Sequence, residues 1–312
     1  MWQKVKYALY RGMFTPLAWL PMPVLYSIGS GLRVILERVV KYRRKIVRQN
    51  LSNAFPEKSE AERLEIEHDF YHQLADNFVE TVKLLHLSDA EADARIEVVG
   101  AELPNSYAAQ GRPTVLYLGH YGNWEFVPKI MRHLDYNICA QVYKPLRDKA
   151  FDRLMLKVRS RFGAISIPQA KVFRQLVGWA RSGKPFICGF IADHRSNSKV
   201  AHHTMTFLNQ PTQFNPGGEE IGKRLDAAYV YLDVEKPSRG HYRLTFRPIE
   251  PANLEEDSPY TRQYMRMLEA TIRRRPGLWL WSHRRWKWNR QAPQTEAPEN
   301  RQNDQPNTQH QI

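Results

Sequence analysis

An uncharged apolar run, Thr114–Leu118, ends directly at a glycine and a histidine. A run of this length without charge predicts a central β-strand that is covered on both faces, which requires a sheet with helices on each side. Gly119 and Gly122 permit a tight turn and a close approach of a ligand to the backbone, and Asn123 can cap a following helix. We therefore expect His120 in a loop at the carboxyl end of a strand, where open α/β sheets bind ligands.

His120 is followed five positions later by a glutamate, Glu125. On one continuous helix the two side chains would diverge by about 140 degrees, so they can meet only if the loop turns between them. Meeting there, the carboxylate would fix the tautomer of the imidazole and leave its other nitrogen as a base. The pair has no nucleophile of its own, so the attacking hydroxyl would come from a substrate. The alternative is a packed histidine beside a glutamate that interacts with a helix dipole.

The segment Gly119–Glu125, Gly-His-Tyr-Gly-Asn-Trp-Glu, resembles the H-x4-D/E motif of the lysophospholipid acyltransferase superfamily, in the form found in lipid A lauroyl and myristoyl transferases. The bare H-x4-E pattern is common, whereas the seven-residue version is specific. The resemblance extends from Tyr42 to Trp288. It implies transfer of a long-chain acyl group from an acyl-carrier-protein or CoA thioester to a lipid hydroxyl. This chemistry requires no metal and no organic cofactor.

The resemblance also implies further site residues. An arginine before Phe162-Gly163 matches an active-site arginine of the family, and this is Arg161, with Arg159 as the alternative. An aspartate after the predicted strand 186–191 matches another family position. Together with cationic and polar residues at other strand ends and loops, the residues expected to bind substrate are Asn123, Lys144, Arg161, Asp193 and Thr212. Residues 196–203 depart from the family pattern, with His202-His203 as a local peculiarity.

The chain is strongly basic, with a formal net charge of +14 and a pI near 9.7. This charge implies an anionic partner, either a nucleic acid or an anionic membrane surface. Cys139 and Cys188 lie in apolar runs and are expected as buried thiols, which excludes a disulfide framework and a cysteine-based zinc site. His68 and His72 lie four apart, but no third ligand accompanies them, so we predict no metal there.

Residues 13–32 contain no charge over 20 positions, about the length of a membrane-spanning helix. Pro16, Pro21 and Pro23 interrupt the segment, so an interfacial or re-entrant anchor is an alternative, and a secretory signal peptide is a third. Basic residues are concentrated after the segment, in residues 33–48. If the segment spans the membrane, this asymmetry places the rest of the chain in the cytoplasm.

The remaining patterns predict a basic amphipathic helix over 42–56, a long helix from Ser59 to about His86, and two antiparallel strands over 229–235 and 241–248. The Trp- and Arg-rich segment 279–288 resembles a C-terminal element of the family. We expect it to form, with the N-terminus, an apolar and cationic surface at the mouth of the cleft. Residues 289–312 have almost nothing to bury and are expected to be disordered.

These observations predict an α/β fold with a mixed, largely parallel sheet, helices on both faces and an N-terminal membrane anchor. The expected divisions are an anchor and basic helix (1–45), an acyltransferase domain (46–288) and a disordered tail (289–312). The expected enzyme is a monomer on the cytoplasmic face of a bacterial inner membrane, which takes acyl groups from acyl-carrier protein and transfers them to an anionic glycolipid such as a lipid A precursor. No nucleic acid is expected as partner.

Other readings stay open from the sequence alone. The acceptor can be a lysophospholipid, an amino-acid lipid or a phosphatidylinositol mannoside. A protein of another class, one that binds an anionic membrane surface or single-stranded nucleic acid without catalysis, would also use basic, aromatic-rich ends. The intact pair of His120 and Glu125 favours the enzyme.

Overall fold

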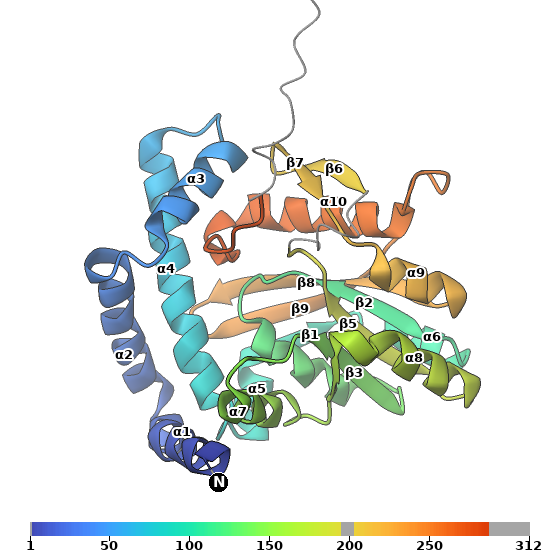
Figure 1. The fold of residues 1–312 in the computed structure, drawn as a ribbon, viewed down its shortest axis with the longest axis horizontal. Coiled ribbons are helices and arrows are strands. Elements are labelled where there is room, and N and C mark those ends of the chain that lie inside the picture. Colours follow the sequence, from blue (N-terminus) through green and yellow to red (C-terminus); the bar gives the residue numbers. More distant parts are fainter. Residues whose placement is uncertain (1, 195–202, 287–312) are drawn as a thin grey trace, which may run out of the picture.

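The computed structural model describes residues 2–194 and 203–286, and its centre is a mixed sheet (Figure 1). The sheet has 7 strands in the order β1-β9-β8-β2-β5-β3-β4. Their bounds are β1 Ile96–Val99, β2 Thr114–Leu118, β3 Ile138–Tyr143, β4 Ile165–Pro168, β5 Phe186–Ile191, β8 Ala228–Ser238 and β9 His241–Pro248. Only the pairing of β8 with β9 is antiparallel, so the predicted largely parallel sheet is confirmed.

Strand β2 lies inside the sheet, and all five of its residues are buried. It pairs in parallel with β8 on one side and with β5 on the other, with Leu118 opposite Ile191. Because parallel strands end at the same edge, the loops after β2 and β5 begin side by side. This register brings residues that follow position 118 close to residues that follow position 191.

Helices pack against the sheet and against one another. Their bounds are α3 Arg44–Ala54, α4 Glu60–Lys83, α5 Asp89–Arg95, α6 Glu102–Ala109, α7 Lys149–Arg159, α8 Val172–Arg181, α9 Gly217–Arg224 and α10 Pro259–Arg274, with 3-10 segments η2 Trp124–His133, η3 Gln169–Lys171 and η4 Pro276–Leu278. The long helix predicted from Ser59 is confirmed, because Ser59 and Glu62 form a reciprocal capping box at the start of α4. Figure 1 shows α4 between the sheet and the N-terminal helices.

The N-terminal segment forms α1 (Trp2–Trp19), α2 (Met22–Val34) and a π-helical turn η1 (Ile35–Val39). Pro16 lies inside α1, and the break falls at Pro21. Among the described residues, no single helix has the length and apolar character to cross a membrane. Helix α1 together with the helical segment Met22–Val39 satisfies both criteria, but the two are bent by 119°.

One face of each N-terminal helix packs on the domain. Phe14 and Ala18 of α1 pack with Leu154 of α7, and Met22 and Leu25 of α2 pack with α4. The opposite faces expose large apolar side chains, namely Trp2, Val5, Leu9, Met13, Trp19, Val24, Ile28, Val34, Ile35, Val39 and Val40. The anchor predicted from residues 13–32 is therefore an angled pair of helices attached to the domain.

Two parts of the chain differ from the sequence predictions. Thr212, expected at a strand end or in a loop, lies on β7 (Gln210–Gln213), which forms a hairpin with β6 (Thr204–Phe207). The described part of the Trp- and Arg-rich C-terminal segment, residues 279–286, is mostly buried and does not form the expected surface. Trp281 is fully buried, and Trp279 and Arg285 expose 2% and 4%. The expected cationic surface from this segment is wrong, because its indoles pack into the core beside the motif loop. The predicted tail, 289–312, lies outside the described residues.

Candidate active site

The histidine of the motif is held by an aspartate from the neighbouring strand. His120 follows β2, and its Nδ1 lies 2.7 Å from Oδ1 of Asp193, which follows β5. The backbone N–H of His120 also donates to Oδ2 of the same carboxylate at 2.9 Å. The parallel register of β2 and β5 produces this contact, because Leu118 and Ile191 are opposite each other and both chains turn out of the sheet two residues later.

The charge state of Asp193 fixes the tautomer of His120. Burial by itself raises the pKa of this carboxyl, but the charge and N–H of His120, together with the indole N–H of Trp279, hold it well below its ordinary value. An ionised carboxylate only accepts hydrogen bonds, so Nδ1 of His120 carries the proton and donates. The neutral ring then presents an unprotonated Nε2, an atom suited to accept a proton.

Glu125 does not have the position expected for it. Its carboxylate accepts two hydrogen bonds from Arg159, at 2.8 Å from Nε and 2.6 Å from Nη2. The carboxylate that orients His120 is that of Asp193, so the predicted pairing of His120 with Glu125 is corrected. Glu125 begins a 3-10 segment that faces α7, and a bidentate arginine satisfies its lone pairs there.

A close approach between elements explains the glycines of the motif. A Cβ on Gly119 would lie 2.6 Å from Cδ1 of Leu268 on α10 and 3.5 Å from the Asp193 carboxylate. Gly122 has φ +60, a conformation that favours glycine. The motif loop thus passes between α10 and the sheet only because these positions lack side chains.

The C-terminal segment fixes the motif loop from the other side. Gly122 N–H donates to the Leu278 carbonyl at 3.0 Å, and Leu280 N–H donates to the His120 carbonyl at 3.2 Å. The indole N–H of Trp279 donates to Asp193 Oδ2 at 2.8 Å. The aromatic residues of this segment therefore position the aspartate and the histidine, a role that their composition did not indicate.

Three histidine rings are stacked at the site. The rings of His120 and His194 are 3.5 Å apart and nearly parallel, and His283 stacks on the other face of His194 at 3.9 Å. The Nε2 atom of His194 is buried and has no hydrogen-bond partner among the described residues. The only sequence signal for His194 is its position directly after Asp193.

The buried position of His194 predicts a pH dependence of stability. Burial, with His120 nearby, lowers the pKa of His194 to about 2, whereas a histidine in an unfolded chain titrates near about 6.5. Between these values the unfolded chain binds a proton that the folded chain does not. The free energy of unfolding therefore decreases as the pH falls below about 6.5, by up to about 1.4 kcal/mol per pH unit from this group.

We expect His194→Gln to reduce this slope, as measured by urea denaturation of the wild type and the variant between about pH 7 and about pH 5. His241→Gln, which changes an exposed histidine, is the matched control and should keep the wild-type slope. Equal slopes for wild type and His194→Gln would contradict the prediction.

A buried arginine lies beside the histidines. Burial lowers the pKa of Arg285 to about 10, and Asp193 and Tyr264 counter part of this effect. Its Nε and Nη2 atoms are buried, and within residues 2–194 and 203–286 they have no hydrogen-bond partner. An unsatisfied buried guanidinium is costly, so these N–H groups are suited to donate to an anionic or carbonyl oxygen.

The other predicted substrate-binding residues have different surroundings. Asn123 is buried, with Nδ2 donating to Glu80 and Oδ1 accepting from Glu125 N–H. Thr212 is buried and accepts a hydrogen bond from the Trp286 indole at 2.7 Å. Both use their polar atoms for internal contacts, and the structure does not bring them to His120 directly.

Arg161 and Lys144 lie nearer to solvent. Arg161 forms an ion pair with Asp89 of α5 at 3.7 Å, and its guanidinium lies over the Phe162 ring. Arg159, the alternative, is the arginine that binds the motif glutamate. Lys144 is exposed directly after β3. Of the two arginines, the contacts connect only Arg159 with a motif residue.

Three residues at the site carry atoms that could bind a metal, although no metal was expected. His120, Asp193 and His194 offer potential ligand atoms within 4.8 Å of one another. The rings of His120 and His194 are nearly parallel and stacked, so their in-plane lone pairs lie in two separate planes. His203, half of the predicted peculiarity, pairs with Asp257, while His202 lies outside the described residues. The arrangement suits a base with its orienting carboxylate.

Comparisons with known proteins agree with this geometry. The model of the bacterial lipid A biosynthesis acyltransferase family matches residues 2–288. The chain is 26% identical over 270 residues to a lipid A biosynthesis lauroyltransferase of Escherichia coli (strain K12), covering 86% of this chain and 87% of that protein. It is 24% identical over 273 residues to a lipid A biosynthesis palmitoleoyltransferase of Escherichia coli (strain K12) and to a lipid A biosynthesis acyltransferase of Shigella flexneri, with 86% of each chain covered. The chain therefore belongs to the bacterial lipid A biosynthesis acyltransferase family and is an O-acyltransferase.

Proposed function

We propose that this enzyme transfers a long-chain acyl group from an acyl-carrier-protein thioester to a hydroxyl of a lipid A precursor, with His120 as general base. The observation that carries the proposal is the contact of His120 Nδ1 with Asp193 at the shared edge of β2 and β5. Asp193 takes the orienting role that the sequence suggested for Glu125.

In the proposed reaction, Nε2 of His120 takes the proton of the acceptor hydroxyl while its oxygen attacks the thioester carbonyl carbon. The C–O bond forms, and the carbonyl electrons move to oxygen to give a tetrahedral intermediate. Arg285, whose buried Nε and Nη2 atoms have no partner in the described part of the chain, is the candidate donor to the developing negative charge. The carbonyl reforms, the C–S bond breaks, and the leaving thiolate takes the proton from His120. The products are an ester and a thiol, and His120 returns to its neutral state.

We also propose that the enzyme works at the cytoplasmic face of the bacterial inner membrane and is held there by α1 and α2. The exposed faces of these helices carry large apolar residues, such as Trp19, Val24 and Ile28. Exposed basic residues follow in Lys41–Lys45. A glycolipid acceptor with phosphates stays in the bilayer, and this surface allows the enzyme to reach it there. Each basic residue near an anionic leaflet contributes about 1 kcal/mol and is screened by salt, whereas apolar insertion is not.

A triple substitution tests the apolar contact with the membrane. We expect Trp19→Ser/Val24→Ser/Ile28→Ser to convert salt-resistant association into binding that high salt removes, measured by flotation with phosphatidylethanolamine and phosphatidylglycerol vesicles. Substitution of exposed residues is preferred to deletion, because deleting α1 and α2 would expose Val79, Val82 and Leu154 of the domain. A triple substitution at three exposed positions on or directly after α6, Glu102→Ser/Ser106→Ala/Gln110→Ser, is the control. Salt-resistant binding by the triple variant would contradict the role of this face.

The donor and the acceptor are tested with purified protein. We expect acyl transfer from an acyl-carrier-protein thioester to a lipid A precursor in mixed vesicles, detected by mass spectrometry of the extracted lipid. Parallel reactions with the CoA thioester, and with a lysophospholipid as acceptor, separate the alternative donor and acceptor. Transfer to the lysophospholipid but not to the lipid A precursor would overturn the proposed acceptor.

A further inference from the structure

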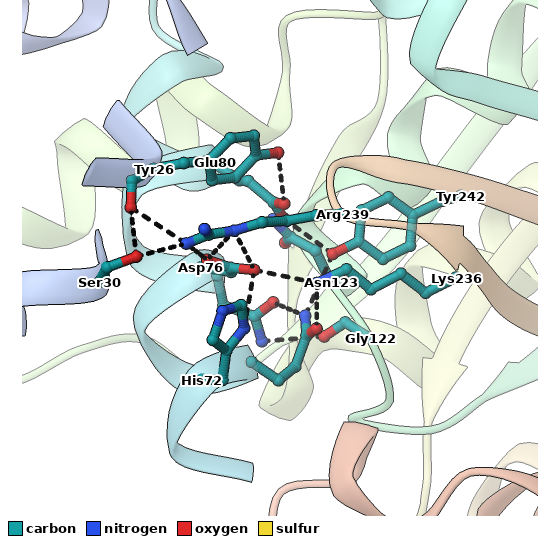
Figure 2. Close-up of polar contacts among 12 residues, drawn as sticks. Tyr26, Ser30, His72, Asp76, Glu80, Gly122, Asn123, Lys236, Arg239 and Tyr242 are labelled. Carbon is teal, nitrogen blue, oxygen red and sulfur yellow. Dashed lines mark hydrogen bonds and ion pairs between the residues drawn. The ribbon is translucent and has the colours of Figure 1, made fainter. Parts of the chain in front are cut away.

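A buried polar network joins the motif loop to α4. On α4, Asn77 Nδ2 donates to the Gly122 carbonyl at 2.9 Å, and Glu80 Oε2 accepts from Asn123 Nδ2 at 2.9 Å. Figure 2 shows Glu80 and Asn123 in the same group of polar contacts beside α4. Asn123 in turn caps the following segment through Glu125 N–H at 3.1 Å. Two neighbouring turns of α4 therefore fix the part of the loop directly after His120.

The Glu80 carboxylate is fully buried and has two further donors. Oε2 also accepts from the Tyr242 hydroxyl at 2.9 Å, and Oε1 accepts from the Tyr26 hydroxyl at 3.0 Å. Burial raises the pKa of this carboxyl, and Lys236 with the Asn123 and Tyr242 donors acts in the opposite direction. Three donors suit the ionised carboxylate, because it has four lone-pair positions and no proton to place. Glu80 thus contacts the motif loop with one oxygen and helix α2 with the other.

A second set of contacts connects α2 to the same face of α4. Arg239 Nη2 donates to the Tyr26 carbonyl at 3.1 Å and to Ser30 Oγ at 3.3 Å, and it pairs with Asp76 Oδ1 at 2.7 Å. Its guanidinium also lies 4.4 Å from the centre of the Tyr26 ring. Lys236, which is buried, pairs with Asp76 at 3.1 Å. The network is continuous from α2 through α4 to the motif loop (Figure 2).

We propose that Glu80 is a positioning residue of this acyltransferase, which holds the motif loop through Asn123 and makes its geometry depend on the docking of α2 against α4. The proposal rests on the proposed acyl transfer. It gives a physical reason for the polar residues between α2 and α4. A directional hydrogen bond ties the motif loop to the position of α2, whereas apolar packing alone would let α2 slide along α4. Because α2 carries Val24 and Ile28 on its outer face, the membrane-facing helix and the motif loop would form one unit.

A polarity swap tests the contact without removing the cap. Asn123→Asp keeps an oxygen for Glu125 N–H, but it places a second carboxylate against Glu80, and buried like charges repel. The motif loop must then move, and a displacement of about 1 Å costs about 100-fold in rate. We expect at least about a 10-fold fall in kcat with little change in KM.

The double variant Asn123→Asp/Glu80→Gln should recover activity. The glutamine amide then donates to the aspartate, so the hydrogen bond is restored with reversed polarity, and the buried charge near Lys236 is conserved. We expect kcat of the double variant to return to within about 3-fold of Glu80→Gln alone, a coupling typical of residues in contact. If the double variant is no more active than Asn123→Asp, the positioning role of Glu80 is wrong.

A separate variant tests whether the motif loop depends on the contact between α2 and Glu80. Tyr26→Phe removes only the hydroxyl that reaches Glu80 and keeps the ring under Arg239. We expect kcat to fall about 5-fold, the equivalent of one hydrogen bond, with little change in KM, and we expect the unfolding midpoint to fall as well because the lost donor leaves a buried carboxylate oxygen without it. Tyr10→Phe is the matched control, because Tyr10 also links an N-terminal helix to the domain, through Asp148 at 3.1 Å, but not to the motif loop. Equal activities of the two phenylalanine variants would refute the link to α2.

The same proteins separate this proposal from the proposed function. If the wild type transfers no acyl group to any lipid, the proposed function fails. Urea denaturation of the wild type, both single variants and the double variant then decides whether Asn123 and Glu80 are coupled. Additive effects on the midpoint would refute the contact, whereas recovery in the double variant would support it. If the wild type is active, the kcat values of the wild type, the two single variants and the double variant decide whether Glu80 positions the loop.

Discussion

Replacing His120 with alanine is expected to lower kcat for acyl transfer by about 100- to 10,000-fold, the usual contribution of a general base. In the proposed mechanism Nε2 of His120 is the base for the acceptor hydroxyl, since Asp193 already holds Nδ1. Without it, the hydroxyl must attack while still protonated. The measurement is the initial rate of acyl transfer by purified protein in vesicles, with unfolding followed in parallel.

The matched control for this prediction is His241→Ala, which removes an exposed histidine at the start of β9. It should keep the wild-type rate. Near-normal activity of a folded, membrane-bound His120→Ala protein would exclude the general-base mechanism.

Asp193→Asn is expected to lower kcat by roughly 1,000- to 10,000-fold, the effect of a tautomer reversal in a histidine-aspartate pair. Oδ2 of Asp193 accepts from the backbone of His120 and from Trp279, so the amide oxygen of the variant is best placed there. Its NH2 group then faces Nδ1 of His120. The ring must accept at Nδ1 and carry its proton on Nε2, where the base is needed.

Glu125→Gln is the comparison that identifies the orienting carboxylate. It breaks the buried pair with Arg159, so we expect its main effect on folding, a loss of about 3 kcal/mol in the free energy of unfolding. Adding Arg159→Met should restore much of this loss, because no charge then remains unpaired. If Glu125→Gln instead leaves stability unchanged and reduces kcat as much as Asp193→Asn, then Glu125 orients the base after all. Both quantities come from urea denaturation and initial rates on the same preparations.

The sequence determined the positions of the central strands. The strands expected at 114–118, 186–191 and 241–248 have the same bounds in the structure. These segments are apolar or alternate with period 2, so local pattern and final burial agree. The capping box at Ser59 likewise involves only residues three positions apart, so it also depends on local sequence. The motif itself was also readable, because all seven of its residues are contiguous.

Only the tertiary structure decided which side chains meet His120. Glu125 was the nearby carboxylate in sequence, whereas Asp193 lies 73 positions away and is brought to His120 by the pairing of β2 with β5. Sequence patterns describe burial, but they do not state which strands are neighbours or how their ends are aligned. The same limit applies to the C-terminal segment, since alternating tryptophan and arginine are compatible with a membrane surface and also with a buried segment that packs on the site. The hydrogen bond from the Trp279 indole to Asp193 requires the segment to be buried against the motif loop. This contact forms only because strands β2 and β5 place the aspartate within reach.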